Sequence, residues 1–262
     1  MFEALLSNRT VSVLMEALPR ILTAGKAELA SLPEGKLLIN TINAHSYNTA
    51  RKDRLFAEAL TNGDVLIPDG VSIVKACRWI KAKSLPKERI AGWDLFEFEM
   101  NKLEECGVTN VSRERPLTVM FMGSSEKVLD LIVKRAAKVY PHLKVVTYSP
   151  PYKPEFSEED NKAIIDAINA ADPDLLWIGM TAPKQEKWTY SHWDELNIHC
   201  HVGTIGAVFD FFAGTVERAP MWWQRHGLEW LYRLLKEPKR MWRRYIIGNA
   251  LFLFNVIFRE RW

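Results

Sequence analysis

Residues 65–72, Val-Leu-Ile-Pro-Asp-Gly-Val-Ser, contain the pattern on which the predicted fold depends. An apolar run ends at Pro68, and Asp69 and Gly70 then precede a segment whose apolar residues have helical spacing. This order predicts a buried strand, a tight turn and the start of a helix. In an open α/β sheet, ligands bind at such turns, outside the carboxyl ends of the strands. Asp69 is therefore a candidate for accepting a proton or a hydrogen bond, although a role as helix N-cap is the alternative.

The same alternation continues along the chain. Short apolar runs predict further strands at residues 36–41, 117–122, 145–148, 174–180 and 199–202. Segments of helical periodicity predict helices at residues 11–25, 47–60, 93–106, 127–140, 157–171, 184–196 and 207–213. Strands and helices that alternate at this spacing are typical of βαβ units. The predicted fold class is therefore α/β, with a Rossmann-like, mostly parallel sheet flanked by helices.

The composition is that of an ordinary globular protein. The chain has 262 residues, of which 48% are hydrophobic and 26% charged, and its net charge is +3. Three widely spaced cysteines without a Cys-x-x-Cys motif predict neither a disulfide framework nor a zinc site, which favours a reducing compartment. Residues 1–18 have no recognisable secretion signal. These features lead us to expect a cytoplasmic protein.

The C-terminal part differs in character. Strand signals end near Pro220, and residues 222–258 look entirely helical, so we expect a core at 1–219 and a helical appendage at 220–262. From Arg218 onward there are ten Lys or Arg and three Glu, interleaved with aromatic residues. This mixture suits an anionic membrane surface. A nucleic-acid contact and a packed helix with a solvated basic face are the alternatives. The longest apolar run, 245–258, is shorter than the roughly 20 residues that span a bilayer.

Two strand-to-helix turns offer candidate phosphate contacts. Gly123 and Ser124 lie between a predicted strand and helix, where backbone N–H groups bind phosphate readily, although a plain connecting loop explains them equally well. In the second turn, Pro183 suits the first helical position. Lys184 and Gln185 follow it and offer a charge and an amide at the positive end of the helix dipole. A solvated helix start is the alternative there.

A third turn is bounded by Gly203 and Gly206. Asp210, one helical turn further on, is a candidate ligand for a nucleoside hydroxyl or base edge, with a structural carboxylate as the alternative. His45, near Asn43, is a further candidate for lining the Asp69 crevice, but an isolated histidine is more often structural.

The sequence motifs of several kinds of enzyme are absent. There is no His-Glu-x-x-His and no Cys/His cluster, so we predict no tightly held metal. Gly-x-Ser-x-Gly is absent, and no Ser/His/Asp arrangement can be defended. No Gly-x-Gly-x-x-Gly is followed by an acidic residue about 20 positions later, which argues against a nicotinamide-dependent oxidoreductase.

Taken together, several stretches resemble the WecG/TagA/CpsF family of bacterial glycosyltransferases, glycosyltransferase family 26. They occur in the order of that family, and the matching segments are 41–44, 68–70, 88–95, 182–188, 206–214, 218–220 and 227–234. The sequence departs from the family pattern at Ile42, at His45-Ser46 and at Thr181-Ala182. These departures leave the identity of the sugar open.

The resemblance implies an inverting, metal-independent transfer of N-acetylmannosamine, or of a related sugar such as N-acetylmannosaminuronate or glucose, from a UDP donor. The implied acceptor is a polyprenyl-diphosphate-linked sugar, and the implied process is bacterial surface polysaccharide synthesis. No cofactor is implied beyond the UDP-sugar substrate. The protein is expected at the inner face of the membrane, peripherally bound to its anionic surface, without a nucleic-acid partner and compatible with a homo-oligomer. The alternative function is a nucleotide- or sugar-nucleotide-binding module without turnover.

The resemblance also assigns roles to residues. Asp69 matches the proposed base of the family, and Thr41 and Asn43 match the pocket beside it. Departure of UDP leaves charge on a diphosphate, which without a metal must be stabilised by helix N-termini and cationic side chains. The candidates for this role are Lys184, Gln185 and the Gly203–Gly206 turn in the body of the chain, and Arg233, Arg240 and Arg243 in the tail.

Overall fold

A computed structural model describes residues 25–82, 85–109 and 115–258. The helix predicted at 11–25 lies outside the described residues except for Gly25. Six strands form one sheet in the order β2-β1-β6-β5-β3-β4. The neighbouring pairs β1·β6, β6·β5, β5·β3 and β3·β4 are all parallel. The strands are β1 (Leu37–Ile42), β2 (Val65–Pro68), β3 (Thr118–Gly123), β4 (Lys144–Tyr148), β5 (Leu175–Gly179) and β6 (His201–Thr204). The predicted α/β class with a parallel sheet is confirmed.

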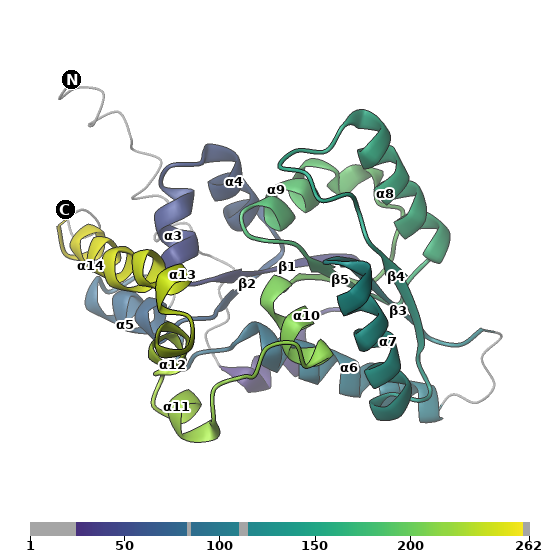
Figure 1. Cartoon of the computed structure of the whole chain (residues 1–262), viewed down its shortest axis with the longest axis horizontal. Helices are drawn as coiled ribbons and strands as arrows, with labels where there is room; N and C mark the ends of the chain where they lie inside the picture. Colours follow the sequence, from purple (N-terminus) through teal and green to yellow (C-terminus); the bar gives the residue numbers. More distant parts are fainter. Residues whose placement is uncertain (1–24, 83–84, 110–114, 259–262) are drawn as a thin grey trace. The chain divides into compact units, whose positions relative to one another are not determined.

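Helices connect the strands and continue after the last one (Figure 1). Those of the α/β part are α3 (Ala44–Ala50), α4 (Arg54–Asn62), α5 (Val71–Trp79), α6 (Gly92–Thr109), α7 (Glu126–Val139), α8 (Glu158–Ala171), α9 (Lys184–Ser191) and α10 (Gly206–Ala213), with 3-10 turns η1 (Lys26–Ser31) and η2 (Trp193–Glu195). The C-terminal elements are α11 (Met221–Arg225), α12 (Glu229–Lys236), α13 (Pro238–Trp242), the π-helical turn η3 (Arg243–Ile247) and α14 (Gly248–Phe258).

The predicted bounds of two helices were wrong. The single helix expected at 47–60 is divided into α3 and α4, because the Asp53 side chain accepts the Phe56 N–H and starts a new helix there. The helix expected at 184–196 ends at Ser191, and the short turn η2 follows. Pro183 occupies the N-cap of α9 and not its first helical position. In each case a local backbone hydrogen bond or cap decided a boundary that apolar periodicity does not encode.

The chain forms two compact units, which we describe separately. Unit 2 contains Ser31–Asn40 and Gly92–Glu217, and therefore most of the sheet. On one side of β3, Met120 and Met122 belong to a core with Ile164 and Ile168 of α8. On the other side, the Phe121 ring lies 5.3 Å from that of Phe209 in α10. Helices thus cover both faces of these strands, which accounts for their continuous apolar sequence.

A buried ion pair also stabilises unit 2. The His201 imidazole in β6 contacts the Glu99 carboxylate through Nδ1 at 3.0 Å and the Pro33 carbonyl through Nε2 at 2.9 Å. Both partners are acceptors, so only the doubly protonated imidazolium satisfies both contacts. Burial acts to lower the pKa of His201, but the hydrogen bond and charge of Glu99, together with the Pro33 carbonyl, raise it above its usual value.

This pair predicts a pH dependence of stability. Because the folded-state pKa of His201 is raised, its stabilising contribution is complete below about pH 6.5 and is lost as the pH rises through the folded-state pKa. We expect the unfolding temperature of the wild type to fall over this range relative to that of His201→Gln. The exposed His199→Gln should keep the wild-type slope. Parallel pH profiles for the wild type and His201→Gln would contradict the prediction.

Unit 1 contains Met1–Ala30, Thr41–Ala91 and Arg218–Trp262. Its core joins residues of β1, β2, α3, α4 and α5 with Phe252 and Val256 of α14. The rings of Tyr47 and Phe252 pack edge to face at 5.2 Å, and Asn48 Nδ2 donates to the Gly248 carbonyl at 2.7 Å. The last helix is therefore part of this core. None of the helices in the described part of the chain is long and apolar enough to cross a membrane.

Candidate active site

The turn after β2 places Asp69 in unit 1. The Asp69 N–H donates to the Ile42 carbonyl of β1 at 2.9 Å, so the carboxyl ends of the two strands are held together. Gly70 occupies the N-cap position of α5, and Asp69 lies one residue before it. The position at which a capping aspartate is expected is therefore taken by glycine. The Asp69 side chain is partly buried, with 28% of its surface exposed.

Thr41 and Asn43 flank the residue that binds the Asp69 backbone. Thr41 is partly exposed in β1. Asn43 caps α3, because its Oδ1 accepts the N–H groups of His45 and Ser46 at 3.0 and 3.1 Å. A Cβ atom on Gly70 would lie only 3.4 Å from Asn43 Cβ, so the Asn43 and Asp69 turns are adjacent. The structure thus brings together the three residues expected in the catalytic pocket.

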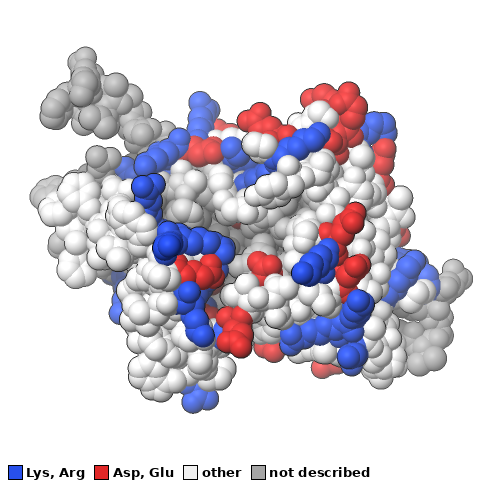
Figure 2. Space-filling model, in the orientation of Figure 1, with Lys and Arg blue, Asp and Glu red and all other residues white. Residues whose placement is uncertain are grey.

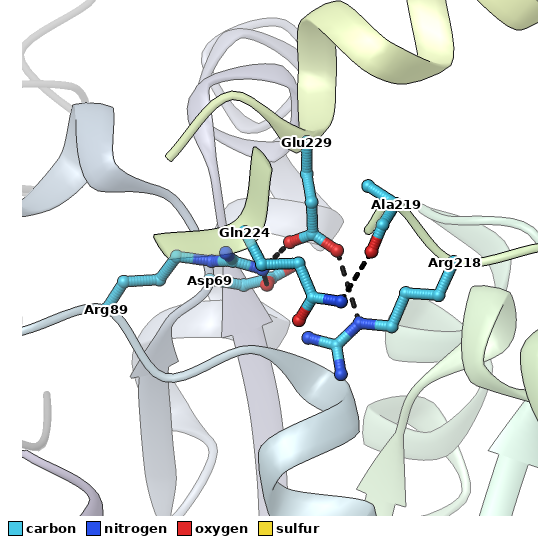
Figure 3. A network of polar contacts seen from close by, with 6 residues as sticks. All are labelled: Asp69, Arg89, Arg218, Ala219, Gln224 and Glu229. Atoms are coloured by element: carbon cyan, nitrogen blue, oxygen red, sulfur yellow. Dashed lines mark hydrogen bonds and ion pairs between the residues drawn. The ribbon is translucent and has the colours of Figure 1, made fainter. Parts of the chain in front are cut away.

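Two arginines and a glutamate belong to a network of polar contacts that includes Asp69 (Figure 3). Arg89 is positioned by the bond from the Ile90 N–H to the Pro68 carbonyl, at 3.1 Å. Its Nη2 lies 3.9 Å from Asp69 Oδ1 and donates a short hydrogen bond to Glu229 Oε2. Arg218 Nε donates to the other Glu229 oxygen, Oε1, at 3.2 Å. Glu229 thus bridges two arginines, one of which contacts Asp69.

Arg244 adds a third positive charge to this part of unit 1. Burial lowers its pKa; the charges of Tyr245 and Asp69 act in the opposite direction, and those of Arg233 and Arg240 add to the lowering. Its Nε atom is buried and makes no hydrogen bond within the described part of the chain. Burial, followed by the charge of Arg244, lowers the pKa of His45 to about 4. His45 is therefore neutral at physiological pH, and Arg244 acts on both His45 and Asp69.

The arginines predicted in the tail have different surroundings. Arg233, in α12, is partly buried and acts electrostatically on Arg244. Arg240 Nη1 donates to Glu237 Oε2 at 2.7 Å, and the Arg243 guanidinium lies 5.3 Å from the centre of the Trp242 ring. Both of these side chains are exposed. The π-helical turn that begins at Arg243 shifts the helical register, and Arg244 is the more buried of the two neighbours.

In unit 2, the predicted turns pack closely against one another. Gly123 has φ 114°, and a Cβ atom there would lie 2.4 Å from the Gly179 carbonyl oxygen. Gly203 lies within β6, and Gly206 begins α10. Ser124 has φ 59°, and its carbonyl accepts the Ser149 hydroxyl at 2.9 Å. Packing alone accounts for Gly123, and a ligand contact stays a prediction.

Gln185 connects two of these turns. Its Oε1 accepts the N–H groups of Met180 and Gly206, at 3.1 and 3.2 Å, and its Nε2 donates to Glu186 Oε1 at 2.9 Å. Gln185 is 4% exposed, and burial raises the pKa of Glu186 to about 7. The side-chain oxygen Oε1 of Gln185 thus links the turn after β5 to the start of α10.

The other two polar candidates of unit 2 also have internal contacts. Lys184 Nζ donates to the Lys153 carbonyl at 2.6 Å and lies 3.4 Å from the centre of the Phe156 ring. Burial lowers the pKa of Lys184. Asp210 Oδ1 accepts the Thr215 hydroxyl at 3.3 Å. A contact of either residue with nucleotide remains a prediction.

The sequence patterns gave no role to four residues near Asp69: Arg89, Arg218, Glu229 and Arg244. The first three lie in segments that carried the family resemblance, which was the available signal. Arg89 and Glu229 are 140 residues apart, and no short-range spacing relates them. In open α/β sheets, ligands bind outside the carboxyl ends of the strands, and arginines can stabilise the charge of a phosphate group there.

Comparison with known proteins identifies the class. Residues 11–262 match the model of the Glycosyl transferase WecG/TagA/CpsF family, and the chain belongs to this family of glycosyltransferases. The resemblance inferred from the sequence is thereby confirmed.

Two relatives carry the same functional description, N-acetylglucosaminyldiphosphoundecaprenol N-acetyl-beta-D-mannosaminyltransferase. The protein of Bacillus subtilis strain 168 is 31% identical over 209 residues, which cover 80% of this chain and 75% of the relative. That of Staphylococcus aureus strain MW2 is 24% identical over 237 residues, which cover 90% and 85%. The similarity therefore extends over most of both chains.

Proposed function

We propose that this protein transfers N-acetylmannosamine, or a related sugar, from a UDP donor to a sugar linked to a polyprenyl diphosphate. The relatives named above are described as N-acetyl-beta-D-mannosaminyltransferases of N-acetylglucosaminyldiphosphoundecaprenol. The observation in the structure that supports the proposal most strongly is the position of Asp69 at the end of β2, 3.9 Å from Arg89 and within the electrostatic influence of Arg244. A base and several cations are what a glycosyl transfer with a diphosphate leaving group requires.

In the proposed mechanism, Asp69 accepts the proton of the acceptor hydroxyl as that oxygen bonds to C1 of the donor sugar. The bond from C1 to the UDP oxygen breaks in the same displacement, so the anomeric configuration inverts. The contacts within the described residues use only the carbonyl oxygen of the Asn43 amide, and its nitrogen is a candidate donor to the sugar. Thr41 is the second candidate for orienting the sugar.

The negative charge that develops on UDP needs stabilisation. We propose that arginines of the C-terminal helices serve this purpose in unit 1, with Arg244 added to the predicted Arg233, Arg240 and Arg243. In unit 2, the starts of α7, α9 and α10 are candidates for binding the nucleotide, since helix N-termini favour anions. The reaction is proposed to need no metal, and activity should persist in excess EDTA.

The transfer reaction is tested by incubating the purified protein with a panel of UDP-sugars and a synthetic lipid-diphosphate-linked N-acetylglucosamine. Mass spectrometry of the lipid product should show the addition of one sugar, with UDP released only when acceptor is present. The alternative, a binding module without turnover, predicts nucleotide binding with no acceptor-dependent release of UDP. That result with every donor tested would reject the proposal.

We also propose that the C-terminal helices bind an anionic membrane surface on the cytoplasmic side. Apolar side chains of α14 are exposed, including Leu253 at 55%, Phe254 at 49% and Phe258 at 59%. The area over α14 is almost free of charged side chains (Figure 2). Exposed Arg240 and Arg243 lie in the preceding elements α13 and η3. Apolar insertion flanked by basic residues is the pattern of interfacial helices.

Membrane binding is expected to fall at least about tenfold when Leu253, Phe254 and Phe258 are all replaced by serine, because three apolar side chains no longer enter the interface. Flotation with liposomes containing anionic lipid measures the effect. The matched control replaces exposed Val133 and Val139 of α7 by serine and should float like the wild type. Equal flotation of the triple variant and the wild type would contradict the proposal. Point substitutions are preferable to deletion, because α14 also carries core residues.

A further inference from the structure

One guanidinium faces two carboxylates beside the proposed base. Arg89 Nη2 donates to Glu229 Oε2, and the same nitrogen lies 3.9 Å from Asp69 Oδ1. Figure 3 shows the Arg89 side chain between the two acidic groups. The distance to Asp69 permits an ion pair but is too long for a hydrogen bond. All three side chains are less than one third exposed, so solvent screens these charges only in part.

The two carboxylates come from different parts of unit 1. Asp69 follows β2, whereas Glu229 is the first residue of α12, among the C-terminal helices. Glu229 is held from a second side, because Arg218 Nε donates to its Oε1 at 3.2 Å. Glu229 therefore lies between two arginines, and Arg89 approaches Glu229 more closely than it approaches Asp69.

Which of the two carboxylates binds Arg89 matters for catalysis. A hydrogen-bonded arginine stabilises the ionised form of a carboxylate and makes it a weaker base. We infer that Glu229 is a positioning residue that holds Arg89 away from hydrogen-bonding distance of Asp69 and so maintains the strength of the base. This inference depends on the proposed role of Asp69 as base.

Three other charged or titratable groups of unit 1 bear on this comparison, and Arg218 loses a charged partner when Glu229 is replaced. Arg244 of η3 acts on Asp69 through its charge, and Arg218 is bound to Glu229. His45 of α3 is neutral, since burial and Arg244 lower its pKa to about 4. Arg89 contacts both carboxylates within 4 Å.

The first test uses Glu229→Gln, which removes the charge and keeps the size of the side chain. Arg89 should then close on Asp69. The acid limb of the pH profile of kcat/KM should move about one pH unit lower, and the rate on the plateau should fall about tenfold. The double variant Arg89→Gln/Glu229→Gln should have the same acid limb as the single variant Arg89→Gln, because the arginine that would move is absent from both. Glu237→Gln removes a carboxylate that binds exposed Arg240 at the start of α13, and it should not move the limb.

A purely structural role for Glu229 predicts a different result. Activity would fall at all pH values with no shift of the acid limb, and Arg89→Gln would not alter the effect. That outcome would overturn the inference. If Glu229→Gln does not fold, Glu229→Asp provides the test, because it retains the charge and shortens the reach by one methylene. A smaller shift in the same direction is expected, and an unmoved acid limb would overturn the inference.

A second measurement does not depend on turnover. The carboxyl ¹³C resonance of Asp69, assigned with Asp69→Asn, is titrated in the wild type and in Glu229→Gln. The midpoint should be lower in Glu229→Gln, and equal midpoints would overturn the inference. If the midpoint moves but Asp69→Asn retains wild-type turnover, the proposed role of Asp69 as base fails, while the control of Arg89 by Glu229 stands.

Discussion

Replacing Asp69 with asparagine is expected to lower the turnover number for sugar transfer by about 10²- to 10⁴-fold, the usual contribution of a positioned general base. Asparagine retains the size of the side chain but cannot accept the proton of the acceptor hydroxyl. The Michaelis constants for donor and acceptor should change little, because the lost interaction belongs to the transition state. Initial rates of UDP release with saturating acceptor measure the effect.

Asp130→Asn is the matched control for this experiment. Asp130 lies on α7 and is exposed, and its substitution should leave turnover unchanged. Circular dichroism and thermal unfolding of both variants establish that the fold is retained. A correctly folded Asp69→Asn variant with wild-type turnover would exclude Asp69 as the base.

The second large effect concerns stability. Phe252→Ala is expected to lower the free energy of unfolding by about 3–5 kcal/mol, because it leaves a cavity in the core of unit 1. Phe252 is 1% exposed and packs against Tyr47 at a ring distance of 5.2 Å. Chemical denaturation measures the change. The expected loss is a large fraction of the stability of an ordinary domain.

Phe254 gives the control on the same helix. Its side chain is 49% exposed, and Phe254→Ala should change the free energy of unfolding by no more than about 0.5 kcal/mol. Similar stability of the two variants would show that α14 does not belong to the core of unit 1. The comparison separates the structural face of α14 from the face proposed to bind the membrane.

Much of the fold could be predicted from local sequence. The apolar runs of the strands and the turn at Asp69 were identified because burial on both faces leaves continuous hydrophobic segments. The family resemblance suggested Asn43 as a pocket residue, whereas its helix-capping role became visible only in the structure. The division between α3 and α4 was missed because the Asp53 cap determines the boundary, and apolar periodicity does not report a cap.

The surroundings of Asp69 could not be predicted in the same way. The contact of Arg89 with Glu229 joins residues that are 140 positions apart, and only folding makes them neighbours. Arg244 was passed over because regular helical spacing gives no reason to choose it over Arg243, whereas the π-helical turn changes the register at this point. Long-range ion pairs and irregular helical turns were thus the features that sequence patterns did not contain.

The central claim is that one carboxylate, Asp69, removes the acceptor proton in a single displacement at the anomeric carbon. The anomeric configuration of the product tests it most directly. With a UDP-α-sugar donor and a lipid-diphosphate-linked acceptor, the one-bond C1–H1 coupling constant of the new linkage distinguishes the two anomers. The account predicts a β-linked product that is formed in the presence of EDTA. An α-linked product would contradict it, because a single displacement cannot retain the configuration.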